Sequence, residues 1–387
     1  MPGIVGTEAA RSRRTTRGHP MTIDLQTEND HGHAATELDL DRVVAFAGQI
    51  AQNHAIASNG VLTYLGDRLG LWRTLASVGP VTSAELAEHA GLAERYVREW
   101  VSAQAAAGYV TYDAATQRFT LPAEHAAVLA DDDSPAALVG AFEITAAVWA
   151  SVDRLAHAYT TGEGVGWHEH DDRLFSGVER FFRPLYAGSL VDAWIPAVDG
   201  LTARLTAGAR VLDVGCGLGS ATLLMAEAFP ASTFLGVDNH GESVRRATAA
   251  AQRAGAADRV AFTEAAADEY DGGPYDVICM FDALHDMGDP LGALRHARAA
   301  LSDDGILLVV EPAAADRLED NLHPLGLSWY AASATMCVPG SLSQAGGAGL
   351  GAQAGAARLL ELFALEGFGT ARVAATTQFN LVIEARR

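Results

Sequence analysis

The sequence predicts an α/β protein whose second half is an open, mostly parallel sheet and whose first half is mostly helical. Three observations support this prediction. A short apolar strand runs into a glycine-rich turn at Arg210–Gly219, and a second strand ends in an acid about 20 residues later. Before residue 200, apolar residues recur at helical spacing. At roughly 150 residues per domain, 387 residues allow two or three domains.

Composition limits the classes of function. Hydrophobic residues make up 49% of the chain and charged residues 19%, so a buried core is expected and wholesale disorder is excluded. The net charge of −21 repels phosphates and argues against a nucleic-acid partner. Cys216, Cys279 and Cys337 form no CxxC pair, which predicts a reducing, cytoplasmic setting. No apolar run reaches 18 residues, so no membrane span is expected.

Residues 1–36 are predicted to be a flexible tail. Arginines stand there among Ser, Thr and Gly with no apolar segment behind them, unlike a secretory signal. A targeting peptide is one interpretation, and a start at Met21 instead of Met1 is the other. The pair His31 and His33 is expected to be solvated.

Residues 37–125 are predicted to form a winged-helix domain. Helical spacing continues from Leu38 to Leu75, and Ser83 is a candidate cap for a helix that ends at Gly91. A second helix is expected over 94–107, and a hairpin follows at 109–112 and 118–121. Helix, turn, helix and hairpin in this order indicate a winged helix.

This domain is not expected to bind DNA. Its second helix offers Arg95 and Arg98 as cations, but Glu94 and Glu99 offset them. Binding to the phosphate backbone needs several net positive charges. We therefore expect the domain to form a homodimer or to cover a pocket.

Residues 126–200 are predicted to be connecting helices that line a cleft. A helix start is expected at Pro135, a long apolar helix at 137–159, and an aromatic-rich helix at 173–194. In the last of these, Phe182 and Tyr186 are candidate substrate-binding residues, with plain core packing as the alternative. His168–Asp172 contains metal-capable side chains without a regular element to fix them, so no metal is predicted.

The glycine-rich turn opens the predicted domain 201–387 and indicates its ligand. Glycines allow close approach of a ligand to the backbone, and Asp238 at the end of the second strand can accept hydrogen bonds from ribose hydroxyls. Asp213, just before the turn, would repel a pyrophosphate and suits a ligand with a cationic amino-acid end. A nucleoside of that kind fits better than a dinucleotide.

These residues resemble the class I S-adenosylmethionine-dependent methyltransferases. The resemblance is carried by Val211–Gly219 and Gly236–Asp238 and covers roughly 201–387. It implies a Rossmann-like seven-stranded sheet with a final antiparallel hairpin, for which 369–376 and 379–385 are the candidates. It also implies S-adenosyl-L-methionine as cofactor. The candidate cofactor-binding residues around the turn are Asp213, Gly215, Cys216, Gly217, Asp238 and Asn239.

The adenine contact departs from the family pattern. The family often places an acid after the third strand, where this chain has Ala266. The contact is therefore assigned to the backbone of Ala267 or to Asp268. Phe281 and Asp282, in the loop after the fourth strand, complete the candidate cofactor-binding set.

The same loop carries the candidate base. His285-Asp286-Met287 looks like the His-Asp-Trp segment of small-molecule O-methyltransferases, whose histidine is the general base. Glu311 matches the glutamate that flanks this histidine at the end of strand five, and a second flanking acid has no match. The resemblance thus implies His285 and Glu311 as catalytic residues, and a packing or cofactor-contacting role for His285 is the alternative.

An insertion is expected at 313–355, between the fifth strand and the last helix. Its Trp329 and Tyr330 are candidate substrate-binding residues, because insertions at strand ends often form pocket walls or lids. The nearest resemblance is to a group of actinobacterial-looking winged-helix methyltransferases of small molecules. They share the segments 284–290 and 319–321.

The leading hypothesis is an S-adenosylmethionine-dependent methyltransferase that modifies an oxygen of a small molecule, with His285 as base. Alternatives are a cofactor-binding homologue with a different reaction, a winged-helix transcription regulator, and a dehydrogenase.

Overall fold

The computed structural model describes residues 38–387. The predicted tail, with His31 and His33, lies outside the described residues. The chain divides into two units, 1–51 and 52–387. The described part of the first unit is the beginning of helix α1 (Leu40–Arg68). No described helix has both the length and the apolar character needed to cross a membrane.

The predicted winged helix is present at the start of the second unit. It contains α2 (Leu71–Val78), α3 (Ser83–Ala90), α4 (Glu94–Ala106), β1 (Thr111–Asp113), β2 (Arg118–Thr120) and α5 (Ala123–Leu129). Trp72 and Trp100 meet edge to face at 4.7 Å in its buried core. The expected cap is wrong by one residue: Thr82 caps α3, because its side chain and Glu85 form a reciprocal capping box, while the Ser83 hydroxyl donates to Glu94.

The connecting segment differs from its prediction. No helix begins at Pro135, and the single helix expected over 137–159 is two helices, α6 (Gly140–Ala150) and α7 (Val152–Thr161). The break falls at Ser151, whose hydroxyl donates to Ala147 O within α6 and lies 3.1 Å from His170 Nδ1. The aromatic helix α8 (Arg173–Ser189) continues through Pro184 and ends in a π-helical turn, Leu190–Trp194.

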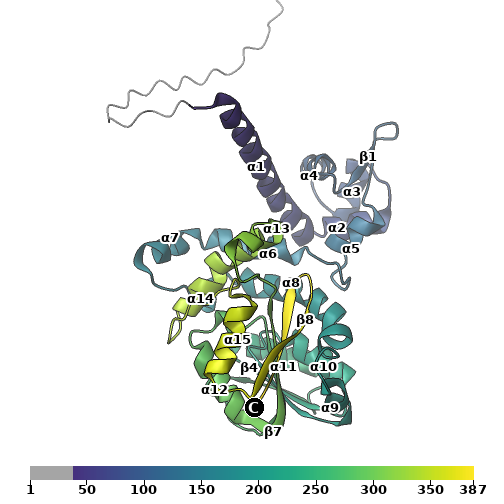
Figure 1. The fold of residues 1–387 in the computed structure, drawn as a ribbon. Helices are drawn as coiled ribbons and strands as arrows, with labels where there is room; N and C mark the ends of the chain where they lie inside the picture. Colours follow the sequence, from purple (N-terminus) through teal and green to yellow (C-terminus); the bar gives the residue numbers. More distant parts are fainter. Residues whose placement is uncertain (1–37) are drawn as a thin grey trace, which may run out of the picture. The chain divides into compact units, whose positions relative to one another are not determined.

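A seven-stranded sheet organises the second half of the chain (Figure 1). Its strand order is β5-β4-β3-β6-β7-β9-β8; neighbours from β5 to β7 pair in parallel, and β9 is antiparallel to both of its neighbours, β7 and β8. The expected sheet and its closing hairpin are thereby confirmed. The strands are β3 (Arg210–Val214), β4 (Thr233–Asp238), β5 (Val260–Glu264), β6 (Tyr275–Phe281), β7 (Leu301–Pro312), β8 (Thr370–Thr376) and β9 (Asn380–Arg386).

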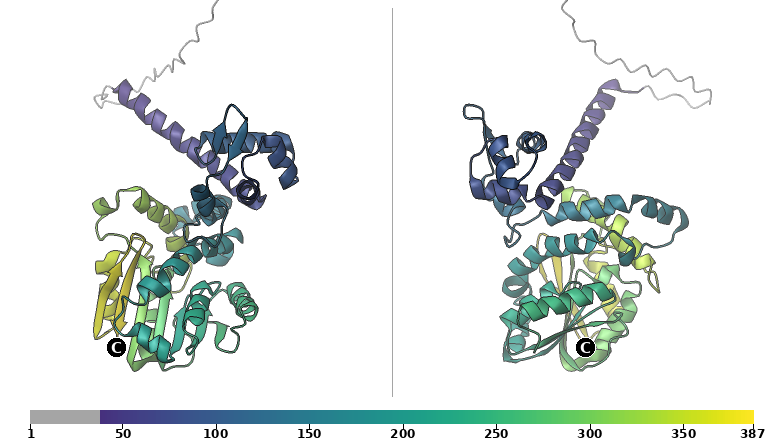
Figure 2. Two further views of the ribbon diagram at one scale, coloured as in Figure 1. Left: turned by 90° about the vertical axis from the view of Figure 1, so that its right-hand side faces the viewer. Right: turned by 180° about the vertical axis from the view of Figure 1, so that it is seen from behind.

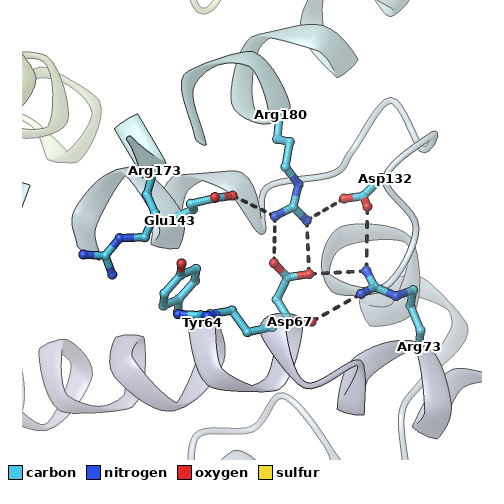
Figure 3. Close-up of a pocket in the computed structure, with 8 residues that line it drawn as sticks. Tyr64, Asp67, Arg73, Asp132, Glu143, Arg173 and Arg180 are labelled. Carbon is cyan, nitrogen blue, oxygen red and sulfur yellow. Dashed lines mark hydrogen bonds and ion pairs between the residues drawn. The ribbon is translucent and has the colours of Figure 1, made fainter. Parts of the chain in front are cut away.

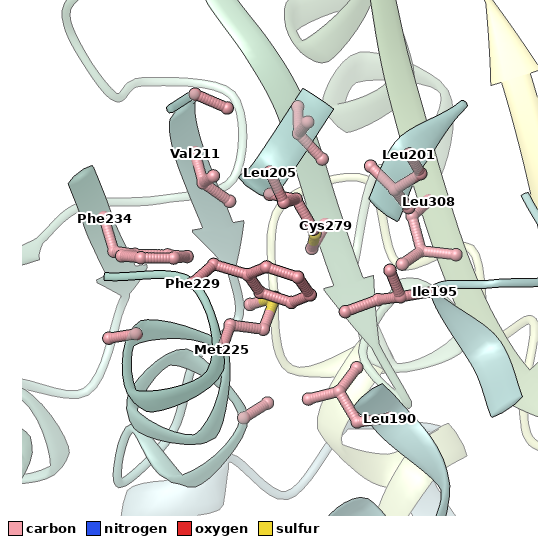
Figure 4. Packing of buried hydrophobic residues seen from close by; sticks show 14 of the residues in the cluster. Leu190, Ile195, Leu201, Leu205, Val211, Met225, Phe229, Phe234, Cys279 and Leu308 are labelled. Carbon is pink, nitrogen blue, oxygen red and sulfur yellow. The ribbon is translucent and has the colours of Figure 1, made fainter. Parts of the chain in front are cut away.

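Helices cover both faces of this sheet (Figure 2). Alternate strand residues point to opposite faces, so Val211 packs in one core and Leu212 in the other. The first core also contains α9 (Leu201–Ala207), α10 (Ser220–Ala228) and α11 (Gly241–Arg253), and Figure 4 shows Met225 and Phe229 among its buried side chains. The second core contains α12 (Pro290–Ala300) and α15 (Gly355–Leu365).

The predicted insertion is folded and hydrogen-bonded to the loop after β6. It comprises a 3₁₀ turn (Leu318–Asn321), α13 (Pro324–Ala332), a π-helical turn (Ser333–Cys337) and α14 (Val338–Leu342). Two amides of its glycine-rich stretch donate to that loop: Ala348 N to Gly288 O at 2.9 Å and Gly351 N to His285 O at 3.1 Å. The expected domain boundaries at 37–125, 126–200 and 201–387 stay a prediction.

An ion-pair cluster connects α1, α6 and α8 and lines a small pocket (Figure 3). Arg180 makes two hydrogen bonds to the Asp67 carboxylate, at 2.7 and 3.1 Å, and also pairs with Glu143 and Asp132. Arg73 pairs with Asp67 from α2. Because the Asp67 side chain is only 6% exposed, its charge is compensated by these arginines and not by water.

We expect Asp67→Ala to lower the free energy of unfolding by roughly 1–3 kcal/mol, because Arg180 and Arg73 lose their buried partner and Arg180 keeps only Glu143 and Asp132. Chemical denaturation measures this change. The control is Glu99→Ala, which removes an exposed pair with Arg95 and should have no measurable effect. Equal stability of both variants would contradict the role of the cluster.

Candidate functional site

The carboxyl ends of the parallel strands open into a cavity of about 1530 Å³. Typical ligand pockets have about 300–1,000 Å³, so this cavity has room for two ligands side by side. Its walls come from the turn after β3, the ends of β4 and β6, helices α6 and α8, and the insertion. An open α/β sheet binds its ligands at this edge.

The glycine-rich turn is held against β4 by its backbone. The amides of Gly215 and Cys216 both donate to Val237 O, at 2.8 and 3.0 Å, and Gly217 N donates to the Asp238 carboxylate at 2.9 Å. Gly215 and Gly217 have φ values of 75° and 53°, which other residues rarely adopt. The turn therefore presents bare backbone to the cavity, as the sequence predicts.

Asp213 and Asp238 place two carboxylates beside this turn. Asp213 is 1% exposed; one oxygen accepts a hydrogen bond from Thr222 at 2.5 Å, and the other has no partner among residues 38–387. Burial raises the pKa of Asp213 to about 7. Burial also raises the pKa of Asp238, although amide hydrogen bonds from His240 and Gly217 oppose that effect. The free oxygen of Asp213 requires a donor, which a ligand in the cavity can supply.

The remaining cofactor candidates lie along the same wall. Cys216, Asn239, Ala267, Asp268, Phe281 and Asp282 all line the cavity. The Phe281 ring also packs into the core against Trp194 and Tyr186. The side chain of Asp282 bonds to Tyr186 and Asn380, which lie on α8 and β9.

His285 is buried beside the cavity and is oriented by Glu311. It lies in a 3₁₀ turn, Leu284–Asp286, and is 5% exposed. Its Nδ1 is 2.5 Å from Glu311 Oε2, while Leu284 N donates to Glu311 Oε1 at 2.9 Å. Glu311 lies within β7 and does not itself line the cavity. It therefore acts on the site by fixing the imidazole and its loop.

The charge on His285 depends on its acidic neighbours. Burial opposes the imidazolium, but the carboxylates of Asp286 and Glu311 outweigh burial and raise the pKa of His285 well above its usual value. The Nε2 atom lies 3.2 Å from Asp286 Oδ1, and both residues line the cavity. A base at this position becomes neutral only at a pH above the ordinary histidine range.

His285, Asp286 and Cys337 also have the spacing of metal ligands, with donor atoms that all lie within 4.8 Å of one another. Burial raises the pKa of the Cys337 thiol to about 11. The stretch His168–Asp172 is not gathered in this way, because His170 contacts Ser151 and Asp171 pairs with Arg173.

Aromatic side chains line the part of the cavity formed by α8 and the insertion. Phe182 and Tyr186 stack at 5.8 Å on α8, and Trp329 of α13 lines the same space. Tyr330 is not part of the lining, since it lies on another side of α13. Three of the four substrate candidates are thus brought together.

The sequence analysis missed Thr222, Asn380 and Cys337. Thr222 lies in the first turn of α10, directly after the glycine-rich turn. Its hydroxyl could therefore have been suggested as a hydrogen-bond partner for Asp213. Asn380 and Cys337 gave no signal, because their partners Asp282 and His285 are far away in the sequence.

Two protein families match parts of the chain. Residues 57–131 match the Rv2258c-like winged HTH domain, and residues 182–342 match a methyltransferase domain. The chain joins a winged helix-turn-helix domain to a methyltransferase domain. The class I methyltransferase fold behind a winged helix, which the sequence predicts, is thereby confirmed.

Relatives of the methyltransferase domain agree with this assignment. The chain is 33% identical over 130 residues to the 27-O-demethylrifamycin SV methyltransferase of Amycolatopsis mediterranei (strain S699). That match covers 32% of this chain and 47% of the relative. The chain thus spans about half of the relative's length.

Two solved structures share the fold. The mitomycin 7-O-methyltransferase MmcR has a TM-score of 0.66 and 21% identity, covering 90% of this chain and 100% of that one. Human N-acetylserotonin methyltransferase, solved in complex with SAM, has a TM-score of 0.63 and 17% identity, covering 92% and 99% of the two chains.

Proposed function

We propose that the protein is an S-adenosylmethionine-dependent methyltransferase that modifies a hydroxyl oxygen of a small molecule. The observation that carries the proposal is one cavity that joins the glycine turn, with Asp213 and Asp238, to the His285–Glu311 pair. The names of two similar proteins, the 27-O-demethylrifamycin SV and mitomycin 7-O-methyltransferases, support transfer to oxygen.

The residues of the turn fit the proposed cofactor. Bound S-adenosylmethionine would supply an activated methyl group on its sulfonium. The free oxygen of Asp213 suits the ammonium of its amino-acid end, and the backbone of Gly215, Cys216 and Gly217 leaves room beside it. Asp238 and Asn239 would bind the ribose, and Ala267 and Asp268 the adenine; all four residues line the cavity.

His285 is proposed as the general base. A hydroxyl acceptor must lose its proton as it takes the methyl group, and Nε2 of neutral His285, a residue of the cavity lining, would receive it. Glu311 holds Nδ1–H and then stabilises the imidazolium that forms, so Glu311 is a positioning residue. The aromatic walls of α8 and α13 exclude water and hold the acceptor in line.

The winged helix is proposed as a dimerisation domain, not a DNA reader. On α4, Arg98 is already paired with Glu94 and Arg95 with Glu99. Helix α1 carries a row of exposed apolar side chains, which a second copy of the chain would cover. Its most exposed members are Leu40, Val44, Phe46, Ile56 and Val61.

The cofactor assignment predicts that S-adenosylhomocysteine binds with measurable heat and raises the melting temperature. Asp238→Ala should weaken binding roughly 10–100-fold, the worth of hydrogen bonds to a charged group. Isothermal calorimetry measures the affinity, and Asp258→Ala is the control because that acid is 80% exposed. No heat and no thermal shift with the unchanged protein would refute the assignment.

The base assignment predicts that His285→Ala lowers turnover roughly 10²–10⁴-fold and leaves S-adenosylhomocysteine affinity intact. Turnover is followed as release of S-adenosylhomocysteine with a panel of phenols and hydroxyquinones. In the unchanged enzyme, turnover should rise with pH through a limb above the usual histidine pKa, because neutral His285 forms only there. His157→Ala, at an exposed histidine, is the control. Full turnover in His285→Ala would contradict the role.

The dimer assignment predicts a solution mass of twice 40.5 kDa by light scattering. Phe46→Glu combined with Ile56→Glu should give the monomer mass, because charges replace two exposed apolar contacts. Gln52→Glu adds a charge to the same helix without removing an apolar side chain and should leave the dimer intact. A monomeric unchanged protein would disprove the assignment.

A further inference from the structure

Asp282 has an unusual backbone and an unusual set of partners. It directly follows β6 and has a φ of 49°, the left-handed region that costs a non-glycine residue roughly 1–3 kcal/mol. Its amide donates to Val310 O at 2.7 Å, which holds it at the cavity wall. Its carboxylate accepts hydrogen bonds from Asn380 Nδ2 at 2.9 Å and from the Tyr186 hydroxyl at 3.3 Å. Strain of this kind at a cavity wall indicates a functional position.

The partners of Asp282 place its side chain on the acceptor half of the cavity. In the sheet, β4 and its Asp238 lie on one side of β3, whereas β6, β7 and β9 follow in order on the other side. One hydrogen bond of Asp282 leads away from β4, to Asn380 of β9, and the other leads to Tyr186 of α8, whose ring packs on Phe281 of β6. Its sequence neighbour His285 lies in the turn that starts two residues later.

The cavity around Asp282 lacks a compensating cation. The sequence contains no lysine, and no arginine lines the cavity within the described part of the chain. His285 is already engaged by Glu311 and Asp286. Burial, together with the nearby Glu311 carboxylate, raises the pKa of Asp282 to about 7. A buried carboxyl in such surroundings gains most from a positively charged partner.

Asn380 adds an unsatisfied acceptor beside Asp282. It is 1% exposed, its amide nitrogen donates to Asp282, and its Oδ1 has no hydrogen-bond partner in the part of the chain that the structure describes. Buried polar atoms normally have partners. Asp282 and Asn380 therefore both offer acceptor oxygens to a group that donates hydrogen bonds.

The charges of the cavity lining limit which ligands can bind. It carries seven acids and, apart from His240 and His285, no basic side chain among residues 38–387; the acids are Glu179, Asp213, Asp238, Asp268, Asp282, Asp286 and Asp289. Most other lining residues are apolar or aromatic. A carboxylate or phosphate would meet mostly like charges here, whereas an ammonium on an apolar ring system would be stabilised.

We propose that Asp282, held by Asn380 and Tyr186, anchors a protonated amine of the methyl acceptor, so that the enzyme acts on apolar ring compounds that carry an amine and excludes acidic ones. This substrate class rests on the proposed function. The amine is held by Asp282 while a hydroxyl of the same molecule faces His285. The anchor sets which molecules bind and takes no part in proton transfer.

The test uses three ring compounds of similar size with the full-length protein, titrated by fluorescence with and without S-adenosylhomocysteine. They are 9-aminoacridine as the cationic donor, 9-anthracenemethanol as the neutral probe and 9-anthracenecarboxylate as the anion. The unchanged protein should bind 9-aminoacridine at least about 10-fold more tightly than the carboxylate, since a hydrogen bond to a charged group is worth roughly 10–100-fold. This comparison requires no variant to fold.

Asp282→Asn should weaken 9-aminoacridine binding about 10-fold or more and leave 9-anthracenemethanol binding unchanged. The matched control is Asp289→Asn, which removes one negative charge from the same lining, while asparagine can still cap α12 through the Gly292 amide. Equal losses in both variants, or a carboxylate that binds as tightly as the amine, would overturn the anchor. The probes are also titrated without S-adenosylhomocysteine. If only the cofactor assignment is wrong, S-adenosylhomocysteine will not bind, while the preference of the unchanged protein for 9-aminoacridine will persist.

Discussion

The arrangement of the proposed catalytic side of the cavity depends on one buried carboxylate. Glu311, 1% exposed within β7, accepts a hydrogen bond from the amide of Leu284 with one oxygen and contacts Nδ1 of His285 with the other. A charge so far from water is stable only when its partners are fixed. The pair therefore ties the loop after β6 to the neighbouring strand and sets the direction of Nε2. The proposed proton transfer depends on that direction.

The parallel sheet explains why the two halves of the site meet. Alternate residues of β3, β6 and β7 fill cores on opposite faces, so the strands are rigid and their carboxyl ends are fixed in register. The glycine turn follows β3, Asp238 is the last residue of β4, and Asp282 and His285 follow β6. Antiparallel β9 begins at the same edge and contributes Asn380. Cofactor and acceptor groups thereby line one cavity although they come from distant parts of the sequence.

Much of this arrangement could be predicted from local sequence. The strand, glycine turn and distant acid define the cofactor half, because spacing alone places Asp238 beside Gly217. His285 and Glu311 could be paired because both stand at ends of adjacent parallel strands. Local spacing predicted the ends of helices less reliably where tertiary contacts determine them. Ser151 breaks an otherwise continuous apolar helix through bonds that include His170, and Thr82 takes the cap because Glu85 completes the box. The partners of Asp282 depend on topology, so no local pattern could reveal them.

The backbone bonds between the insertion and the loop after β6 bear on how such enzymes diversify. Ser341 donates to Met287 O, the Gln344 side chain contacts the backbone of Asp286 and Gly288, and Gly351 N donates to His285 O. The insertion that lines the cavity and the loop that carries His285, the proposed base, are therefore joined by several hydrogen bonds. A chimaera that takes residues 313–355 from a homologue would have a cavity wall of a different shape, and its His285 imidazole would also be displaced. Evolution of new acceptors in this scaffold is easiest through side chains on α6 and α8, which leave those bonds untouched.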